Sequence, residues 1–256
     1  FLLGAVLLKN YCQRVVTPKG NTKTILNGID LGFSQGEQVA IVGSSGAGKT
    51  SLLKALIFAS EPSSGQVFFN ELNPWLSSSV VRHKLRRLVS FVPQEPSFPL
   101  RQSVYNAVLA GCLPTTNLLT SLVSLIYPKN VDAVTEVLHK FQLSDKIAKR
   151  VDQLSGGERQ RVSLARALIS DASFWTIDEP LSGLDPKLAD TVIKTLRDHA
   201  KQKKITFVCT LHQVEFALRY FPRIVGIKEG NLAFDLPVEK VTSSLLEDTY
   251  ERYVKC

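Results

Sequence analysis

The chain has 256 residues, of which 31 are Lys or Arg and 23 are Asp or Glu, so its formal net charge is +8. A chain of this length can bury a large core, and a basic balance fits nucleic acid, an anionic membrane face or an anionic nucleotide as partner. The four cysteines lack metal-ligand spacing, and the longest apolar runs, residues 1–8 and 118–127, are too short to span a membrane. The composition therefore argues against a zinc module and predicts reduced thiols and no spanning helix.

The first third of the chain is predicted to be mostly strands. Residues 1–35 show apolar alternation interrupted by Pro-Lys-Gly-Asn, which predicts antiparallel strands rather than a signal peptide at the start. Residues 38–42 are apolar and β-rich, as in a buried strand, and residues 51–57 have the apolar spacing of a helix. Further strands are predicted at residues 66–69 and 88–92.

The middle of the chain changes to helical character. Between about 95 and 160 the apolar spacing predicts helices with little β structure between them, at residues 105–111, 131–141 and 145–151. A long helix is expected from Gly157 to about Ser170. Beyond it, two predicted buried strands separated by a helix imply a parallel sheet, and the tail from Pro237 is predicted to be helical. These two strands are at residues 173–177 and 205–209.

Residues 43–50 read G-S-S-G-A-G-K-T, which fits the phosphate-binding pattern G-x-x-x-x-G-K-[ST] without a mismatch. The predicted strand before it and helix after it argue against a chance match. Glycines let the backbone wrap closely, so that N–H groups and a helix N-terminus face the phosphates. Lys49 is expected to contact the β- and γ-phosphates, and the Thr50 hydroxyl to bind magnesium. The residues predicted to hold the nucleotide are Gly43, Ser44, Ser45, Gly46, Ala47, Gly48, Lys49, Thr50 and Ser51.

The second chemical signal is a pair of acids at the end of an apolar strand. Asp178 and Glu179 follow Phe-Trp-Thr-Ile, and neighbours on a strand point to opposite sides, so they can have different roles. Asp178 is expected to hold magnesium, directly or through water, and Glu179 to orient or deprotonate the attacking water. Taken alone, two acids before a proline also fit a helix N-terminus. Their place downstream of the phosphate loop favours catalysis.

Six short segments, which follow one another along the chain in the family's order, make it resemble the nucleotide-binding subunits of ABC transporters over nearly its full length. Residues 43–50 match the Walker A motif, and residues 174–179 match Walker B. The other four segments resemble the Q-loop glutamine (Gln94), the signature motif (residues 154–158), the D-loop (residues 182–185) and the switch histidine (His212).

The resemblance implies an α/β fold, namely a P-loop NTPase core of the ABC type, with an N-terminal antiparallel β subdomain and an inserted α-helical subdomain. The whole chain would be one nucleotide-binding domain. Its ATPase core would comprise residues 1–94 and 154–256, and its helical subdomain about 95–153. The implied enzyme is a transport-coupled ATPase, and the implied cofactors are ATP and Mg²⁺.

The resemblance also assigns roles to residues. Gln94 would sense the metal and His212 would donate a hydrogen bond to the γ-phosphate, so the predicted catalytic set is Glu179, His212 and Gln94. The predicted metal set is Thr50, Gln94 and Asp178. A helix start favours an anion, so the signature residues would meet the γ-phosphate of an ATP held by a second copy, and Asp185 would communicate between the two composite sites. These signature residues are Ser155, Gly156, Gly157 and Glu158.

Two positions depart from the family pattern. Glu158 stands where the family usually has Gln, which leaves the Ser155 hydroxyl and the glycine amides in place. The aromatic residue that usually stacks on adenine is missing near Val15 and Val16, and Tyr11 is the nearest aromatic. Either Tyr11 folds back onto the base, or the base rests on an aliphatic surface.

The implied partners are a second copy of the chain, with ATP sandwiched between the two, integral membrane permease subunits and, indirectly, a periplasmic binding protein. The subunit would lie at the cytoplasmic face of the inner membrane. Residues 150–155, 210–215, 223–227, 234–235 and 246–250 resemble the phosphonate-importer branch, which implies uptake of phosphonate or a related phosphorus oxyanion.

Three other functions are compared with this one. The chain could drive an importer of another small solute, or serve as a non-transport subunit of a carbon–phosphorus lyase assembly. A nucleic-acid-associated ABC ATPase would need a long coiled-coil insertion or tandem motifs, for which 256 residues leave no room. No dense Lys/Arg run with interleaved aromatics is present, and nucleic acid is therefore not an expected partner.

Overall fold

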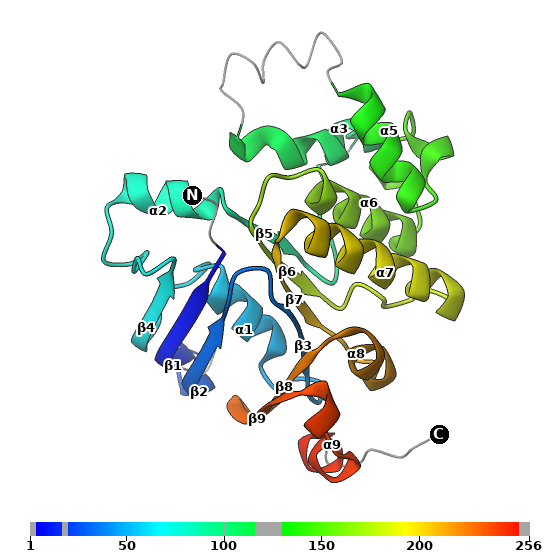
Figure 1. Cartoon of the computed structure of the whole chain (residues 1–256). Coiled ribbons are helices and arrows are strands. Elements are labelled where there is room, and N and C mark those ends of the chain that lie inside the picture. Colours follow the sequence, from blue (N-terminus) through cyan, green and yellow to red (C-terminus); the bar gives the residue numbers. More distant parts are fainter. Residues whose placement is uncertain (1–3, 17–19, 100, 116–129, 251–256) are drawn as a thin grey trace.

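The computed structural model describes residues 4–16, 20–99, 101–115 and 130–250. Two sheets form its framework (Figure 1). The first has three antiparallel strands in the order β2-β1-β4. Its strands are β1 (Val6–Val16), β2 (Thr22–Phe33) and β4 (Ser64–Phe69).

The second sheet has six strands in the order β5-β6-β7-β3-β8-β9, all parallel to their neighbours except β9, which runs antiparallel to β8. The strand β3 lies inside this sheet. The loop after it lies at the carboxyl ends of the parallel strands, which is where α/β proteins commonly bind ligands. The strands are β3 (Gln38–Val42), β5 (Val89–Val92), β6 (Phe174–Asp178), β7 (Thr206–Thr210), β8 (Arg223–Lys228) and β9 (Asn231–Pro237).

The six-stranded sheet separates two hydrophobic cores. Phe174 and Trp175 are neighbours on β6, so their side chains enter opposite faces, and both are fully buried. Phe174 packs with the three-stranded sheet and α1 (Lys49–Leu56), whereas Trp175 packs with α6 (Gly156–Leu168) and α7 (Pro186–Lys203). Burial of such a side chain stabilises the fold by roughly 1.5–3 kcal/mol, so β6 is held firmly from both sides.

A helical region lies beside α6, at the top of Figure 1. It contains α3 (Val104–Leu109) and α5 (Val131–Lys140), and both helices contact α6. The described residues between 95 and 153 contain no strand. The mixed α/β fold with an antiparallel sheet and a helical insertion, predicted from the sequence, is confirmed.

Polar side chains fix where the helices near the site begin. Ser103 accepts a hydrogen bond from Asn106 N–H at the start of α3. Asp185 accepts from the N–H groups of Lys187 and Leu188 at the start of α7, at 3.1 and 3.0 Å. Such caps satisfy N–H groups that have no partner within the helix.

The prediction of a helix at residues 145–151 is wrong. Two short 3₁₀ turns, Ser144–Lys146 and Val151–Gln153, take its place. The N–H of Val151 donates to the carbonyl of Gln102 at 2.8 Å, and the N–H of Val104 donates to the carbonyl of Lys149 at 2.9 Å. Pairing with this neighbouring segment uses the groups that an α-helix would have needed.

Several elements were not predicted. The helix α2 (Ser79–Arg86) is short and buries only Leu85, so few apolar positions mark it in the sequence. The hairpin of β8 and β9 and the helix α8 (Val214–Tyr220) were also missed. The predicted helical tail is confirmed for α9 (Ser243–Tyr250), whereas residues 251–256 and the apolar run at 118–127 lie outside the described residues. In the part of the chain that the structure describes, no helix is long and apolar enough to cross a bilayer.

Candidate functional site

The loop at residues 43–50 connects β3 to α1 and has a backbone that requires glycine. Gly43 has φ of 153°, and a Cβ atom there would lie 2.2 Å from the carbonyl oxygen of Ile227. Gly48 has φ of 107° at the N-cap of α1, and its Cβ would lie 3.1 Å from the carbonyl oxygen of Ile25. A side chain at either position would be strained or would clash, so the close wrap of this loop depends on glycine.

Lys49 crosses the inside of this loop. Its side chain is only 6% exposed, and its ammonium group donates to the carbonyls of Gly43 and Ser44 at 2.8 and 3.1 Å. Burial lowers the pKa of Lys49, and the nearby carboxylates of Glu179 and Asp178 act in the opposite direction. The ammonium group therefore lies where it can move from backbone oxygens to the oxygens of a bound anion.

Asp178 is the buried carboxylate of the site. The hydroxyl of Thr50 donates to its Oδ2 at 2.7 Å, and the hydroxyl of Thr210 donates to its Oδ1 at 2.6 Å. Asp178 on β6 pairs directly with Thr210 on β7. Sequence reasoning did not single out Thr210, although its place as the last residue of the buried strand β7 is a signal that could have found it.

Glu179 follows directly after the same strand, is partly buried with 18% of its side chain exposed, and has a left-handed backbone, with φ of 47°. Its N–H donates to the Thr210 hydroxyl at 2.9 Å, and its Oε2 accepts from the amide of Gln94 at 2.8 Å. Its other oxygen, Oε1, lies 3.9 Å from the ammonium nitrogen of Lys49. A non-glycine residue with positive φ is uncommon and needs support, which these contacts supply.

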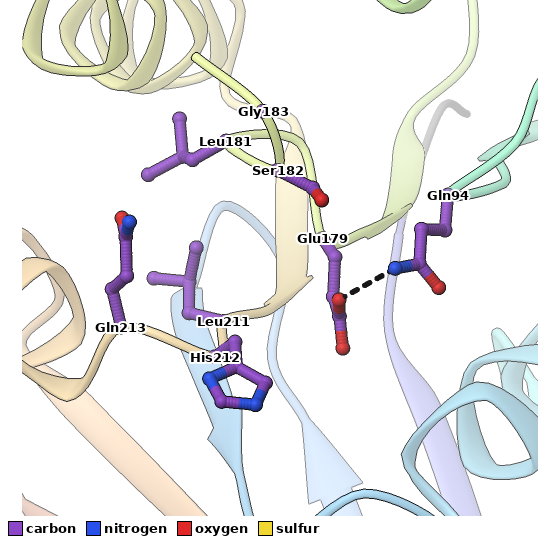
Figure 2. A pocket seen from close by; sticks show the side chains of 8 residues that line it. All are labelled: Gln94, Glu179, Leu181, Ser182, Gly183, Leu211, His212 and Gln213. Atoms are coloured by element: carbon purple, nitrogen blue, oxygen red, sulfur yellow. Dashed lines mark hydrogen bonds between the residues drawn. The ribbon is translucent and has the colours of Figure 1, made fainter. Parts of the chain in front are cut away.

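A cavity of about 350 Å³ opens beside Glu179. Figure 2 shows Gln94 and His212 on opposite sides of Glu179, with the hydrogen bond from Gln94 drawn as a dashed line. The structure thus brings Lys49, Glu179 and Gln94 together and places His212 in the same cavity wall. The lining residues are Gln94, Glu179, Leu181, Ser182, Gly183, Leu211, His212 and Gln213.

The other predicted residues of the loop have distinct surroundings. Ala47 is buried, and its N–H donates to the carbonyl of Ser44 at 3.2 Å. Ser45 and Gly46 are exposed, and no heavy atom lies within 4 Å of the Cβ position of Gly46. The exposed tip of the loop is therefore open to a ligand, while its ends are packed. Ser51 is half-buried in the first turn of α1.

The predicted signature turn begins α6 and forms a capping box. The N–H of Glu158 donates to the Ser155 hydroxyl at 3.2 Å, and the N–H of Ser155 donates to Glu158 Oε2 at 2.8 Å. These bonds and Lys146, 3.5 Å from Glu158 Oε1, hold the pKa of Glu158 below its ordinary value. In the described part of the chain, this turn makes no hydrogen bond to residues 43–50.

The remaining predicted residues are placed as follows. Gly156 is exposed, with open space around its Cβ position, and Gly157 is half-buried. Asp185 is exposed and caps α7, so its side chain is engaged within the protomer. The side chain of Tyr11 is fully buried and its hydroxyl donates to Gln13 at 3.0 Å, so it does not fold back onto a base.

Comparison with known proteins gives a consistent result. The sequence model of the family described as ABC transporter matches residues 26–182. A relative from Albidiferax ferrireducens, named phosphonates import ATP-binding protein PhnC 2, is 50% identical over 88% of this chain and 81% of its own length. One from Polaromonas sp., named phosphonates import ATP-binding protein PhnC, is 47% identical over 97% of this chain and 90% of its own.

Solved structures show the same fold. A dimeric bacterial ABC transporter cassette has a TM-score of 0.81 and 24% sequence identity, and the match covers 91% of this chain and 98% of that one. A second, described as cbiO1 from Clostridium perfringens, part of the transporter complex cbiONQ, has a TM-score of 0.72 and covers 92% of this chain and 89% of that one.

Proposed function

The chain belongs to the ABC transporter family, and on that premise we propose that it is the ATP-binding and ATP-hydrolysing subunit of an importer for phosphonate or a related phosphorus oxyanion. The observation that carries the proposal is one connected polar cluster. It joins the loop after β3 to the end of β6 through Lys49, Thr50 and Asp178. The names of relatives that are 44–50% identical support the choice of cargo.

The loop binds the triphosphate. Lys49 leaves the carbonyls of Gly43 and Ser44 for the β- and γ-phosphates, and the open tip at Ser45 and Gly46 presents N–H groups to their oxygens. The N-terminus of α1 adds its positive dipole end. Ser44, Ala47, Gly48 and Ser51 complete the proposed binding set.

Mg²⁺ fits between Thr50 and Asp178. Their oxygens are 2.7 Å apart, and Mg²⁺ prefers a few protein oxygens together with phosphates and water. The described residues contain no cluster of three or more His, Cys, Asp or Glu able to hold a metal alone, in keeping with a cation shared with the substrate. When bound, the ion neutralises phosphate charge, and Gln94 supplies a further oxygen.

Glu179 is the proposed general base. Its carboxylate borders the cavity and is oriented by Gln94 and by the backbone bond to Thr210. A water held in that cavity can give its proton to Glu179 as it attacks the γ-phosphate. His212, exposed in the cavity wall, donates a hydrogen bond to the γ-phosphate in this scheme.

A second copy completes the site. Ser155 and Gly156 are exposed at the N-terminus of α6, where N–H groups favour an anion. We place this turn, with Gly157 and Glu158, on the γ-phosphate of ATP bound by the partner copy, and Asp185 at the contact between the two sites. ATP is then shared by two protomers, and its hydrolysis opens them.

The base is proposed to rest on an aliphatic surface. Val16 is 75% exposed and Val15 is 43% exposed, whereas Tyr11 is fully buried. Contact with Val16 gives less base discrimination than an aromatic stack, whose extra contribution is about 0.5–1.5 kcal/mol. Most of the nucleotide affinity then comes from the phosphates.

We assign residues 1–94 and 154–256 to the ATPase core and about 95–153 to the helical subdomain, which faces the permease. The periplasmic receptor acts through that permease, and the subunit lies on the cytoplasmic face of the inner membrane.

The proposed function is tested in the reconstituted importer complex. ATPase activity is measured with phosphonate, phosphite and phosphate, each with its receptor protein. Stimulation by phosphonate supports the assigned cargo, and stimulation only by another solute contradicts it. Copurification with soluble lyase subunits rather than with a membrane permease would favour the lyase assembly instead.

A further inference from the structure

The C-terminal helix α9 reaches the phosphate loop. The hydroxyl of Tyr250, the last residue of α9, accepts a hydrogen bond from the N–H of Gly43 at 3.1 Å, across 207 residues of sequence. The helix lies against β8, the strand beside β3, and Leu246 and Thr249 are buried in that contact region. Tyr250 is itself partly buried against the core. Packing of α9 against the core therefore fixes the position of the Tyr250 hydroxyl.

Gly43 is held on three sides. It follows Val42, the last residue of β3 that pairs with β8, and its N–H turns to Tyr250 instead. Its carbonyl accepts from the ammonium of Lys49 at 2.8 Å. On the remaining side, the carbonyl of Ile227 leaves no room even for a Cβ atom. The first residue of the loop thus has its orientation set by α9, α1 and β8 together.

The bond that Gly43 donates to Tyr250 matters because the carbonyl of the same residue holds the ammonium group of Lys49. A backbone N–H away from water needs an acceptor, and losing it leaves the group unsatisfied or rotates the peptide to find another. Rotation at Gly43 would also move the carbonyl that holds Lys49. The Lys49 ammonium group and the backbone N–H groups that follow Gly43 in the loop would then be oriented less well for binding phosphates.

We propose that Tyr250 is a positioning residue for ATP binding, which makes the C-terminal helix a part of the phosphate-binding apparatus. The inference rests on the proposed ATPase function. Tyr250 touches the loop rather than the γ-phosphate, and its effect is equal on bound ATP and on the transition state. Uniform effects of this kind change KM and leave kcat nearly constant.

The test uses Tyr250→Phe, which keeps the ring and removes the hydroxyl. ATP affinity is measured by titration calorimetry, and steady-state kinetics give KM and kcat. We expect Kd and KM for ATP to rise about threefold to tenfold, the range of one hydrogen bond, with kcat within about twofold. The thermal midpoint falls by only a few degrees, the scale expected for the loss of one hydrogen bond.

The matched control is Tyr220→Phe. Tyr220 on α8 also ends in a hydrogen-bonded hydroxyl, which donates to Asp190 on α7. This variant loses the same atom and is expected to keep the ATP affinity of the parent chain. A general cost of removing a tyrosine hydroxyl would appear in both variants.

Amide hydrogen exchange provides a readout that needs no nucleotide. In the nucleotide-free Tyr250→Phe protein, exchange at Gly43 is expected to be about threefold to tenfold faster, with Leu246 and Thr249 unchanged. Faster exchange throughout α9, with a larger fall in the thermal midpoint, would mean that the helix undocks and would overturn a positioning role. Unchanged Kd and unchanged Gly43 exchange would overturn it as well.

The outcomes separate the two proposals. If the parent protein binds ATP and Tyr250→Phe binds it equally well, the role of Tyr250 is wrong and the ATPase proposal stands. If the parent protein does not bind ATP, both proposals fail, whatever the exchange rate at Gly43.

Discussion

At the scale of single residues, Asp178 and Glu179 are neighbours with very different surroundings. Asp178 is buried and accepts two hydroxyl hydrogen bonds, so it is fixed and suited to hold a cation. Glu179 faces the cavity with a left-handed backbone, which turns its side chain away from the strand and toward Gln94. Asp178 is buried at the end of the strand, whereas the positive φ of Glu179 turns the next side chain toward the cavity. Cation binding and proton transfer are thereby assigned to different carboxylates.

Glu179→Gln is expected to bind ATP with nearly the affinity of the parent chain and to hydrolyse it at least roughly 100-fold more slowly, the scale of general base catalysis. Glutamine keeps the size of the side chain but cannot accept the proton. Steady-state phosphate release and ATP titration give the two numbers. Hydrolysis at the parental rate would contradict the assignment of the base.

Part of the site could be predicted from the sequence because some of its residues lie beside short sequence patterns that mark strands and helices. Lys49, Asp178 and Glu179 each lie directly after a strand or at a helix start that the apolar pattern reveals. Thr210 and Tyr250 were not predicted as site residues because their contacts with Asp178 and Gly43 depend on strand register and on helix packing. Such contacts span 32 and 207 residues and leave no local pattern.

At the scale of elements, the loop between β3 and α1 is held by packing at its ends. Gly43 lies against β8, and Gly48 lies against the carbonyl of Ile25 on β2. The strand–loop–helix unit was predicted correctly, with β3 at the predicted residues. The helix at 145–151 was predicted wrongly because contacts with residues 102–104 replaced its internal hydrogen bonds, which a local pattern does not reveal.

Gly43→Ala is expected to destabilise the protein by about 1–3 kcal/mol, since the added methyl group meets the Ile227 carbonyl at 2.2 Å. ATP binding should fall with it. The control is Gly156→Ala, where the Cβ position meets no atom within 4 Å and no loss of stability is expected. Urea unfolding compares the three proteins, and equal midpoints would contradict the tight packing at Gly43.

The capping box of α6 gives a pH-dependent prediction. Glu158→Ala is expected to cost about 1 kcal/mol at neutral pH, because Ser155 N–H loses its acceptor. The pKa of Glu158 is lowered in the folded state, so its stabilisation is present above its ordinary pKa and is lost as pH falls through the lower folded value.

This capping prediction is checked by urea unfolding at several pH values from neutral to below 4.5, the ordinary carboxyl pKa. The difference between the parent chain and Glu158→Ala should shrink as pH decreases. A difference that grows toward low pH would contradict the role of the ionised carboxylate. Glu158→Gln keeps an acceptor and should lie between the two.

At the scale of the whole molecule, one protomer holds only part of the proposed site. The loop, the acids and Gln94 lie together at the edge of the six-stranded sheet, whereas the Ser155 turn has its hydrogen bonds elsewhere. The order of the motifs along the chain was enough to predict the fold. The position of a second copy depends instead on surface residues that are far apart in the sequence, so no short sequence pattern predicts it.

Ser155→Arg is expected to leave ATP binding to the single chain intact, because the turn makes no hydrogen bond to residues 43–50 among the described residues. The bulky cation should block the approach of a second copy and lower ATPase activity at least roughly tenfold. Titration calorimetry and phosphate release separate these effects. Loss of ATP binding by the isolated chain would show that the turn acts within one protomer.

Sharing of one ATP between two protomers is tested by the molar mass of Glu179→Gln, measured by light scattering with and without ATP and Mg²⁺. We expect one chain without nucleotide and two chains with it, while the double variant with Ser155→Arg binds ATP and remains a single chain. Glu179→Gln that binds ATP yet stays monomeric, or a double variant that still pairs, would contradict the shared nucleotide.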